Sequence, residues 1–225
     1  LFVIGSAGFG TRMGPLTANR PKPLIEVAGR PLIDHALALV ETAGLARAVV
    51  NTHYRADQIR AHLAGRRSVT VSDETDEILE TGGGLRRALP LLGPGPVFTL
   101  NTDAVWTGPN PLATLAAAWR PDRMDALLLL VPRERAVGHA GKGDFLTDEA
   151  GRIRPGPGAV YTGAQIIRTD LLATIGDRVF SIWRLWDRMI AEGRAYGVEH
   201  EGGWCDVGHP AAIALAETLL SGPAR

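Results

Sequence analysis

The chain opens with the sequence LFVIGSAGFGTRMGPLT, residues 1–17. Its first four residues form an apolar run that stops at a glycine, as a buried parallel strand does before a loop. The glycine-rich loop that follows can turn its backbone N–H groups toward a phosphate with no β-carbon in the way. Arg12 adds a planar charged fork, and Lys22 adds an ammonium group held between two prolines. We therefore predict an α/β fold with an anion site over residues 4–22.

Two common phosphate-binding loops do not fit this stretch. A P-loop needs G-x-x-x-x-G-K-[ST], and the chain contains no Gly-Lys-Ser or Gly-Lys-Thr. The dinucleotide fingerprint needs G-x-G-x-x-G, but Gly8 and Gly10 are followed by Met13 where the third glycine belongs. The predicted anion site therefore belongs to neither class.

Beyond this loop, apolar runs alternate with segments of helical periodicity. Strands are expected at residues 1–4, 48–50, 69–71, 97–100 and 125–131, and helices at 31–44, 56–63, 83–92 and 112–119. Strands that alternate with helices form a mostly parallel sheet with right-handed crossovers. We therefore predict a Rossmann-like open sheet sandwiched between helices.

The second half of the chain changes character after residue 132. Strands are expected at residues 142–145, 152–154 and 159–167, and we predict that they form a small C-terminal meander that covers the sheet as a lid. A helix at 182–192, a strand at 195–199 and a helix at 210–220 follow. Because there is no internal repeat and no long linker, the 225 residues are expected to form one domain.

The composition excludes several kinds of partner. The 24 basic residues balance the 24 acidic ones, so no net charge attracts nucleic acid or an anionic membrane. Cys205 is the single cysteine, which rules out an internal disulfide and a cysteine-cluster zinc site. No apolar run approaches the roughly 20 residues of a membrane span, and the chain does not open like a signal peptide. We therefore expect a cytoplasmic protein with small-molecule partners.

Two aspartates are candidate metal ligands. Asp103 follows the expected strand at 97–100, and the carboxyl ends of strands are where open α/β sheets bind ligands. Asp206 lies in a second turn, Gly203-Trp204-Cys205-Asp206. Magnesium prefers one or two carboxylates together with phosphate oxygens. Taken alone, either aspartate is more often a turn residue or a helix cap than a metal ligand.

A second glycine-rich turn, Glu80-Thr81-Gly82-Gly83-Gly84, precedes an expected helix. Three glycines at a helix start let a flat base approach the backbone, whose N–H and C=O groups can read the edge of the base. Glu80 and Thr81 add polar side chains. The alternative is a flexible loop with an ordinary helix cap.

Together these motifs resemble the signature of the sugar-1-phosphate nucleotidyltransferases. The shared residues are Gly8-x-Gly10-x-Arg12-Met13-x-Pro15-Leu16-Thr17, Pro21-Lys22-Pro23-Leu24 and Val27-Ala28-Gly29-x-Pro31-Leu32. The E-T-G-G-G turn, together with Asn51, Trp106 and Gly143-Asp144-Phe145, is similar to the branch that activates N-acetylmuramic acid 1-phosphate with UTP in cell-wall recycling. The resemblance spans nearly the whole chain. It departs at Gly14, where the family often has arginine, and at Thr102, where it often has glycine.

The resemblance implies in-line attack of the sugar phosphate on the α-phosphorus of UTP, with Mg²⁺ and release of pyrophosphate. It assigns the metal to Asp103 and Asp206, and it makes Arg12 and Lys22 the catalytic cations. Residues 1–132 become a nucleotide-binding half and residues 133–225 a sugar-binding and lid half. Nucleotide contacts are expected at Ala7, Gly8, Gly10, Thr11, Glu80, Gly82 and Gly83, and sugar contacts at Asn101, Asp144, Thr162 and Gly163.

Two alternatives stay open. One is a relative that acts on glucose 1-phosphate or mannose 1-phosphate with another nucleotide. The other is a non-catalytic nucleotide-binding regulatory domain, which we expect to have lost a catalytic cation or a metal aspartate, whereas this chain keeps all four. N-acetylmuramate also carries a lactyl carboxylate, for which His139, Lys142 and Arg133 are candidates from position alone. The sequence does not predict an oligomeric state.

Overall fold

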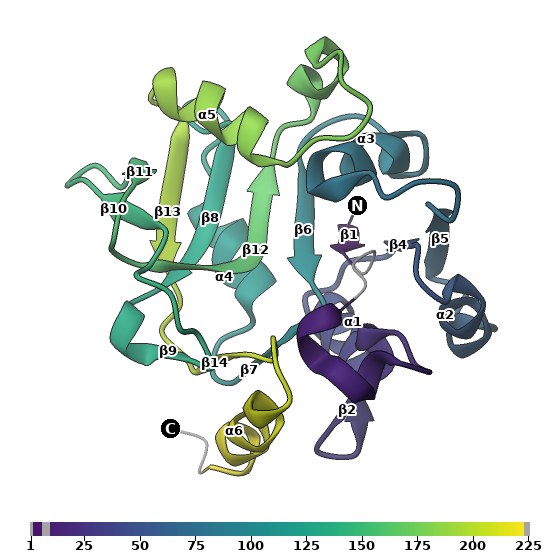
Figure 1. The fold of residues 1–225 in the computed structure, drawn as a ribbon. Coiled ribbons are helices and arrows are strands. Elements are labelled where there is room, and N and C mark those ends of the chain that lie inside the picture. The colour runs from purple at the N-terminus through teal and green to yellow at the C-terminus, as the bar shows by residue number, and fades with distance from the viewer. Residues whose placement is uncertain (1, 6–9, 223–225) are drawn as a thin grey trace.

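A computed structural model describes residues 2–5 and 10–222, and its centre is a seven-stranded sheet (Figure 1). The strands, in spatial order, are β13 (Ala195–Glu199), β8 (Ala126–Val131), β12 (Val160–Ile167), β6 (Val97–Asn101), β1 (Phe2–Gly5), β4 (Ala48–Thr52) and β5 (Val69–Asp73). β1 pairs in parallel with β4 and β6, β4 with β5, and β13 with β8. The predicted open, mostly parallel sheet is confirmed.

Strand β12 does not lie where the sequence led us to expect it. We predicted residues 159–167 in the C-terminal meander, but β12 runs antiparallel between β6 and β8 in the middle of the sheet. The prediction was wrong because the side chains of β12 are buried on both faces of the strand, and the local sequence pattern does not reveal which strands flank it. The expected meander is reduced to the hairpin of β10 (Phe145–Thr147) and β11 (Ile153–Pro155).

Helices cover both faces of the sheet. One face is covered by α3 (Glu80–Leu92) and α5 (Trp183–Ala191), the other by α1 (Leu32–Thr42), α2 (Ala56–Leu63) and α4 (Pro111–Ala118). The leucine run of β8 contributes to the core on both faces. Leu128 and Leu130 belong to the core under α3 and α5, whereas Leu127 and Leu129 belong to the core on the opposite face. This alternation explains why β8 reads as a continuous apolar run.

A smaller sheet carries the second half of the predicted metal pair. It consists of β7 (Ala104–Trp106), β14 (Trp204–Asp206) and β9 (Ala136–Val137), and α6 (Ala211–Ser221) packs against it. One buried cluster joins Met13 of the N-terminal loop to Cys205 of β14 and Ala216 of α6. The glycine-rich loop is thereby fixed to the strand that ends at Asp206.

The remaining elements are short. They are the strands β2 (Glu26–Val27) and β3 (Arg30–Pro31) and the 3₁₀ helices η1 (Thr11–Thr17), η2 (Lys22–Leu24), η3 (Arg133–Arg135) and η4 (Asp170–Thr174). Among the described residues, no helix has the length and apolar character that a bilayer crossing requires.

Candidate active site

The two candidate metal aspartates become neighbours through strand pairing. β14 runs antiparallel to β7, so Asp206 lies opposite Ala104, and the N–H of Val207 donates to the carbonyl oxygen of Asp103 over 2.7 Å. Asp103 itself follows β6, at the carboxyl end of a central strand. Two carboxylates that are far apart in the sequence therefore meet at one edge of the main sheet.

Two cations from the N-terminal segment meet these carboxylates. The Nζ atom of Lys22 lies 2.9 Å from Oδ2 of Asp103. Gly208 lies between Asp206 and Arg12, because a β-carbon added there would fall 3.0 Å from a carboxylate oxygen of Asp206 and 3.3 Å from the Arg12 guanidinium. We call Arg12, Lys22, Asp103 and Asp206 the charged corner.

The electrostatics of the charged corner favour a further cation. Burial raises the pKa of Asp206, and the charge of Asp103 raises it as well. The charges of Lys22 and Arg12 lower this pKa, but they do not cancel the two larger effects. Within the described residues, no group of three or more His, Cys, Asp and Glu side chains is arranged to hold a metal. Two carboxylates nonetheless match the donor set of Mg²⁺ when phosphate oxygens supply the other ligands.

The glycine-rich loop is described only from Gly10 onward. Ala7 and Gly8, which we expect to contact the nucleotide, lie outside the described residues. Gly10 lies against the side chain of Lys22, and Thr11 is exposed at the start of η1. Gly14, where the family often has arginine, has φ 56° and ψ −128°, a left-handed conformation that favours glycine.

A cavity of about 460 Å³ opens beside Asp103, on the sheet face covered by α3 and α5. Part of its lining is polar and part is aromatic. The polar residues include Asn51, Glu80, Thr99, Asn101, Asp103 and Asp144, and the aromatic ones are Phe145, Tyr161, Trp183 and Trp186. We call these four aromatic side chains the aromatic wall.

The predicted sugar-binding residues divide between the cavity and the sheet. Asn101 and Asp144 line the cavity, and a carboxylate oxygen of Asp144 also accepts the N–H of Tyr161 over 2.8 Å. Gly163 packs directly against the side chain of Asn101. Thr162 is buried, and its hydroxyl donates to the carbonyl oxygen of Leu129 over 2.7 Å. A substrate contact by Thr162 therefore stays a prediction.

The second glycine-rich turn is packed against a segment distant in the sequence. The N–H groups of Gly82 and Gly83 both donate to the carbonyl oxygen of Phe180, over 2.9 and 3.1 Å. A β-carbon on Gly82 would overlap the Phe180 ring, and one on Gly83 would lie 2.7 Å from the Arg178 carbonyl oxygen. In this structure these glycines thus hold residues 178–182 against α3, and a base contact by Gly82 and Gly83 stays a prediction.

Glu80 faces the cavity from the first turn of α3. It has φ 59°, one of three left-handed backbones among the described non-glycine residues. Such conformations are strained for a residue with a β-carbon, and they concentrate at functional sites. Next to it, the Thr81 hydroxyl oxygen accepts the N–H of Ile182 over 2.9 Å, which fixes the start of α5.

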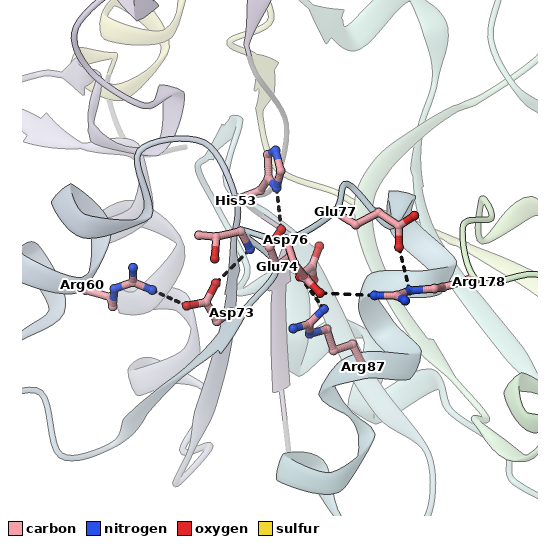
Figure 2. A network of polar contacts seen from close by, with 9 residues as sticks. His53, Arg60, Asp73, Glu74, Asp76, Glu77, Arg87 and Arg178 are labelled. Atoms are coloured by element: carbon pink, nitrogen blue, oxygen red, sulfur yellow. Dashed lines mark hydrogen bonds and ion pairs between the residues drawn. The ribbon is translucent and has the colours of Figure 1, made fainter.

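A polar network braces this side of the cavity (Figure 2). Asp76 accepts hydrogen bonds from Arg87 of α3 and from Arg178, and Glu77 forms an ion pair with Arg178. Glu74, in the same segment, is fully buried and faces the amide of Asn51, and burial raises its pKa. The segment between β5 and α3 is thus tied to residues 178–182.

Two tryptophans that line the cavity, and a buried glutamate next to Asn51, went unrecognised in the sequence. Trp183 and Trp186 occupy positions i and i+3 of a helix, which is also the pattern of ordinary core packing. Glu74 lies in a run of acidic residues, and such runs are usually solvent-exposed. Nothing in the sequence alone marks the two tryptophans as part of the cavity lining or Glu74 as a buried neighbour of Asn51.

Comparison with known proteins gives one consistent result. Residues 2–220 match the MobA-like NTP transferase domain family. The chain is 44% identical to N-acetylmuramate alpha-1-phosphate uridylyltransferase of Caulobacter vibrioides, over 96% of this chain and 95% of that protein. It is 32% identical to the protein of the same name from Neisseria meningitidis, over 96% of both chains.

A solved structure extends the comparison to the fold. It is a putative glucose-1-phosphate thymidylyltransferase from Bacillus anthracis, with a TM-score of 0.82 and 17% identity over 99% of this chain and 97% of that one. At that identity the likeness concerns the fold alone. The two sequence relatives confirm the resemblance drawn from the motifs. The chain therefore belongs to the MobA-like NTP transferase family, as a nucleotidyltransferase related along its length to the N-acetylmuramate alpha-1-phosphate uridylyltransferases.

Proposed function

We propose that this protein transfers the uridylyl group of UTP to N-acetylmuramic acid 1-phosphate and releases pyrophosphate. The observation that carries the proposal is the charged corner itself, where two cations and two carboxylates converge beside a cavity of sugar size. Two relatives of the chain bear the name of this activity.

The chemistry asks mainly for control of charge. A phosphate monoester is already a nucleophile at neutral pH, so the obstacle is to bring two anions together while charge moves onto the leaving pyrophosphate. We assign Lys22 to the α-phosphate, whose charge it would neutralise, and Arg12 to the β- and γ-phosphates. Both lie beside the aspartates, so their charges act at the place where the phosphates meet.

Asp103 and Asp206 would hold the divalent metal that this family generally uses. We propose Mg²⁺, which when bound supplies positive charge to the phosphate oxygens. In the structure Lys22 already bonds to Asp103, so it offsets one of the two carboxylates before substrate binds. Burial and the charge of Asp103 raise the pKa of Asp206, so a bound cation would stabilise the charged form of its carboxylate.

The substrates are divided between the two sides of the cavity. We assign the triphosphate to residues 7–12, the nucleobase to the Glu80 side and the sugar to Asn101, Asp144 and Gly163. Because the substrates are a nucleotide and a sugar phosphate, we further propose a cytoplasmic role in cell-wall recycling, without a nucleic-acid or membrane partner.

The test is a matrix of substrates. The protein is incubated with Mg²⁺, each of UTP, CTP, GTP, ATP and dTTP, and a panel of sugar 1-phosphates, and pyrophosphate release is measured. We expect the fastest release with UTP and N-acetylmuramic acid 1-phosphate. Faster release with glucose 1-phosphate or mannose 1-phosphate would contradict the substrate assignment. No release with any pair would contradict the enzymatic assignment and favour a regulatory domain.

A pair of variants tests the metal assignment in the same assay. Asp103→Asn is expected to lower the rate about a thousandfold while the protein stays folded. The control is Asp57→Asn, because the Asp57 side chain is 94% exposed on α2 and away from the cavity. If Asp103→Asn retained wild-type activity, the assignment of the metal to Asp103 would be wrong.

A further inference from the structure

The charges around the cavity restrict which substituents of a sugar it accepts. Its lining includes the carboxylates Glu80 and Asp144 and that of Asp103, which is paired with Lys22, and among the described residues that line it there is no Lys, Arg or His. A carboxylate brought into such a lining is repelled and loses its water without gaining a partner. The cavity therefore suits neutral substituents, whereas a negatively charged one must point out of it.

The aromatic wall is the apolar part of the same lining. Its rings contact one another in series: Tyr161 meets Trp186 edge-on at 4.9 Å between centroids, Trp186 meets Trp183 at 5.0 Å, and Trp183 stacks on Phe145 at 5.2 Å with an interplanar angle of 21°. Such pairs hold their geometry because edge-on and offset arrangements suit the ring quadrupoles. The wall is thus a continuous surface.

This surface is rigid at one end and accessible at the other. The indole N–H of Trp186 donates to Oε1 of Gln165 over 2.9 Å, and Trp186 is only 2% exposed. Trp183 is 38% exposed although it is large and apolar. An exposed indole at the edge of a cavity, backed by a stacked phenyl ring, offers a flat apolar face to a ligand.

We propose that the aromatic wall is a subsite for the N-acyl group of an amino-sugar 1-phosphate, with Trp183 as its main contact. An N-acetyl group is neutral, flat and ends in a methyl group, so it satisfies both the charge and the shape of this lining. The proposal rests on the proposed function, and it assigns the acyl group, not the lactyl group, as what the cavity recognises.

With the acyl group against the aromatic wall, the lactyl carboxylate of N-acetylmuramate lies outside the cavity. His139, Lys142 and Arg133, its candidate partners from sequence position, are absent from the described cavity lining. Within one substrate the two methyl groups thus have different surroundings: the acetyl methyl group faces aromatic rings, and the lactyl methyl group does not. This difference provides an internal control.

Saturation-transfer NMR measures this difference directly. N-acetylmuramic acid 1-phosphate is added to the wild-type protein, the aromatic protons of the protein are irradiated, and transfer to each methyl group is recorded. We expect severalfold more transfer to the acetyl methyl group, and we expect Trp183→Ala to abolish the excess. Equal transfer to both methyl groups, or an excess that survives in Trp183→Ala, would overturn the subsite.

Kinetics give a second readout with matched variants. N-acetylglucosamine 1-phosphate carries the acyl group without the lactyl group, and glucose 1-phosphate carries neither. Trp183→Ala is expected to lower the preference for the acylated sugar about tenfold, mainly through KM, and Trp183→Phe to keep most of it. Trp119→Ala is the control, because Trp119 is partly buried and packs against the core on the opposite face of the sheet.

The two failures are distinguishable. If wild-type protein neither binds nor converts any sugar 1-phosphate, the proposed function fails and the subsite falls with it. If it converts N-acetylmuramic acid 1-phosphate while Trp183→Ala slows acylated and unacylated sugars equally, only the subsite is wrong.

Discussion

The charged corner and the aromatic wall border the same cavity but are held together in opposite ways. The corner gathers four charged side chains from three distant segments, and burial together with the charge of Asp103 raises the pKa of Asp206. The wall consists of rings that contact one another and a tryptophan fixed by Gln165. The corner is therefore arranged for charges that arrive with the substrates, whereas the wall is complete without them.

The largest effect is expected at the charged corner, where one substitution should lower activity and raise stability. Asp206→Asn should lower the rate of uridylyl transfer about a thousandfold, because it removes a proposed metal ligand. The same change should raise the melting temperature of the substrate-free protein at neutral pH, because it removes a half-buried charge that Asp103 repels. Pyrophosphate release and thermal melting test the two parts. A variant that loses both activity and stability would show that the carboxylate is structural.

The support of the cavity should behave in the opposite way. Gly84 lies inside α3, and a β-carbon there would fall 2.8 Å from Oε1 of Glu74 and 3.2 Å from Nδ2 of Asn51. Gly84→Ala should therefore destabilise the protein by about 1–3 kcal/mol, although alanine favours helices more than glycine does. Chemical denaturation measures the change.

A glycine in open space provides the control for this variant. Nothing lies within 4 Å of a β-carbon added at Gly176. We expect Gly176→Ala to change stability by less than about 0.5 kcal/mol. If the two variants had equal stability, the close approach at Gly84 would not be important.

A smaller effect is expected at the clamp that holds residues 175–180 to α3. The guanidinium of Arg86 donates to the carbonyl oxygens of Ile175 and Asp177, both over 2.6 Å, and lies 4.8 Å from the Phe180 ring centre. Arg86→Ala should cost about 1–2 kcal/mol of stability and raise KM for the sugar phosphate more than it lowers kcat. Arg87→Ala, which removes an exposed ion pair with Asp76, should cost less than about 1 kcal/mol.

The smallest predicted effect is a pH dependence caused by Glu74. Its pKa is raised in the fold by burial, so the folded protein binds a proton more readily than the unfolded chain. This contribution to stability is present below the ordinary carboxyl pKa and is lost as pH rises through the raised one. Glu74→Gln should match the wild-type melting temperature in acid and exceed it at neutral pH. A lower melting temperature at neutral pH would show that the carboxylate charge has a stabilising partner.

The two regions also differ in how far the sequence predicts them. The charged corner was predictable because its residues follow strand ends and glycine turns, where ligands of α/β sheets bind, and because the family motifs pair Asp103 with Asp206. The structure brings these residues together. The aromatic wall was not predictable, since Trp183 and Trp186 have the spacing of any amphipathic helix.

The fold shows the same limit. Most strands and helices follow from apolar periodicity, but the position of β12 depends on which strands it pairs with, and local patterning does not contain that information. α3 begins at Glu80, three residues earlier than expected. Glycine has a low helix propensity, so the sequence places Gly82 outside the helix, but its contact with Phe180 favours a glycine at this position.

We propose above that the charged corner and its cavity transfer a uridylyl group to a sugar phosphate. Phosphorus-31 NMR of the wild-type protein with UTP, Mg²⁺ and N-acetylmuramic acid 1-phosphate tests it most directly, because all reacting phosphorus atoms are visible at once. We expect UDP-N-acetylmuramic acid and pyrophosphate to appear in equal amounts as both substrates disappear. Hydrolysis of UTP without a sugar nucleotide, or no change in any signal, would contradict it.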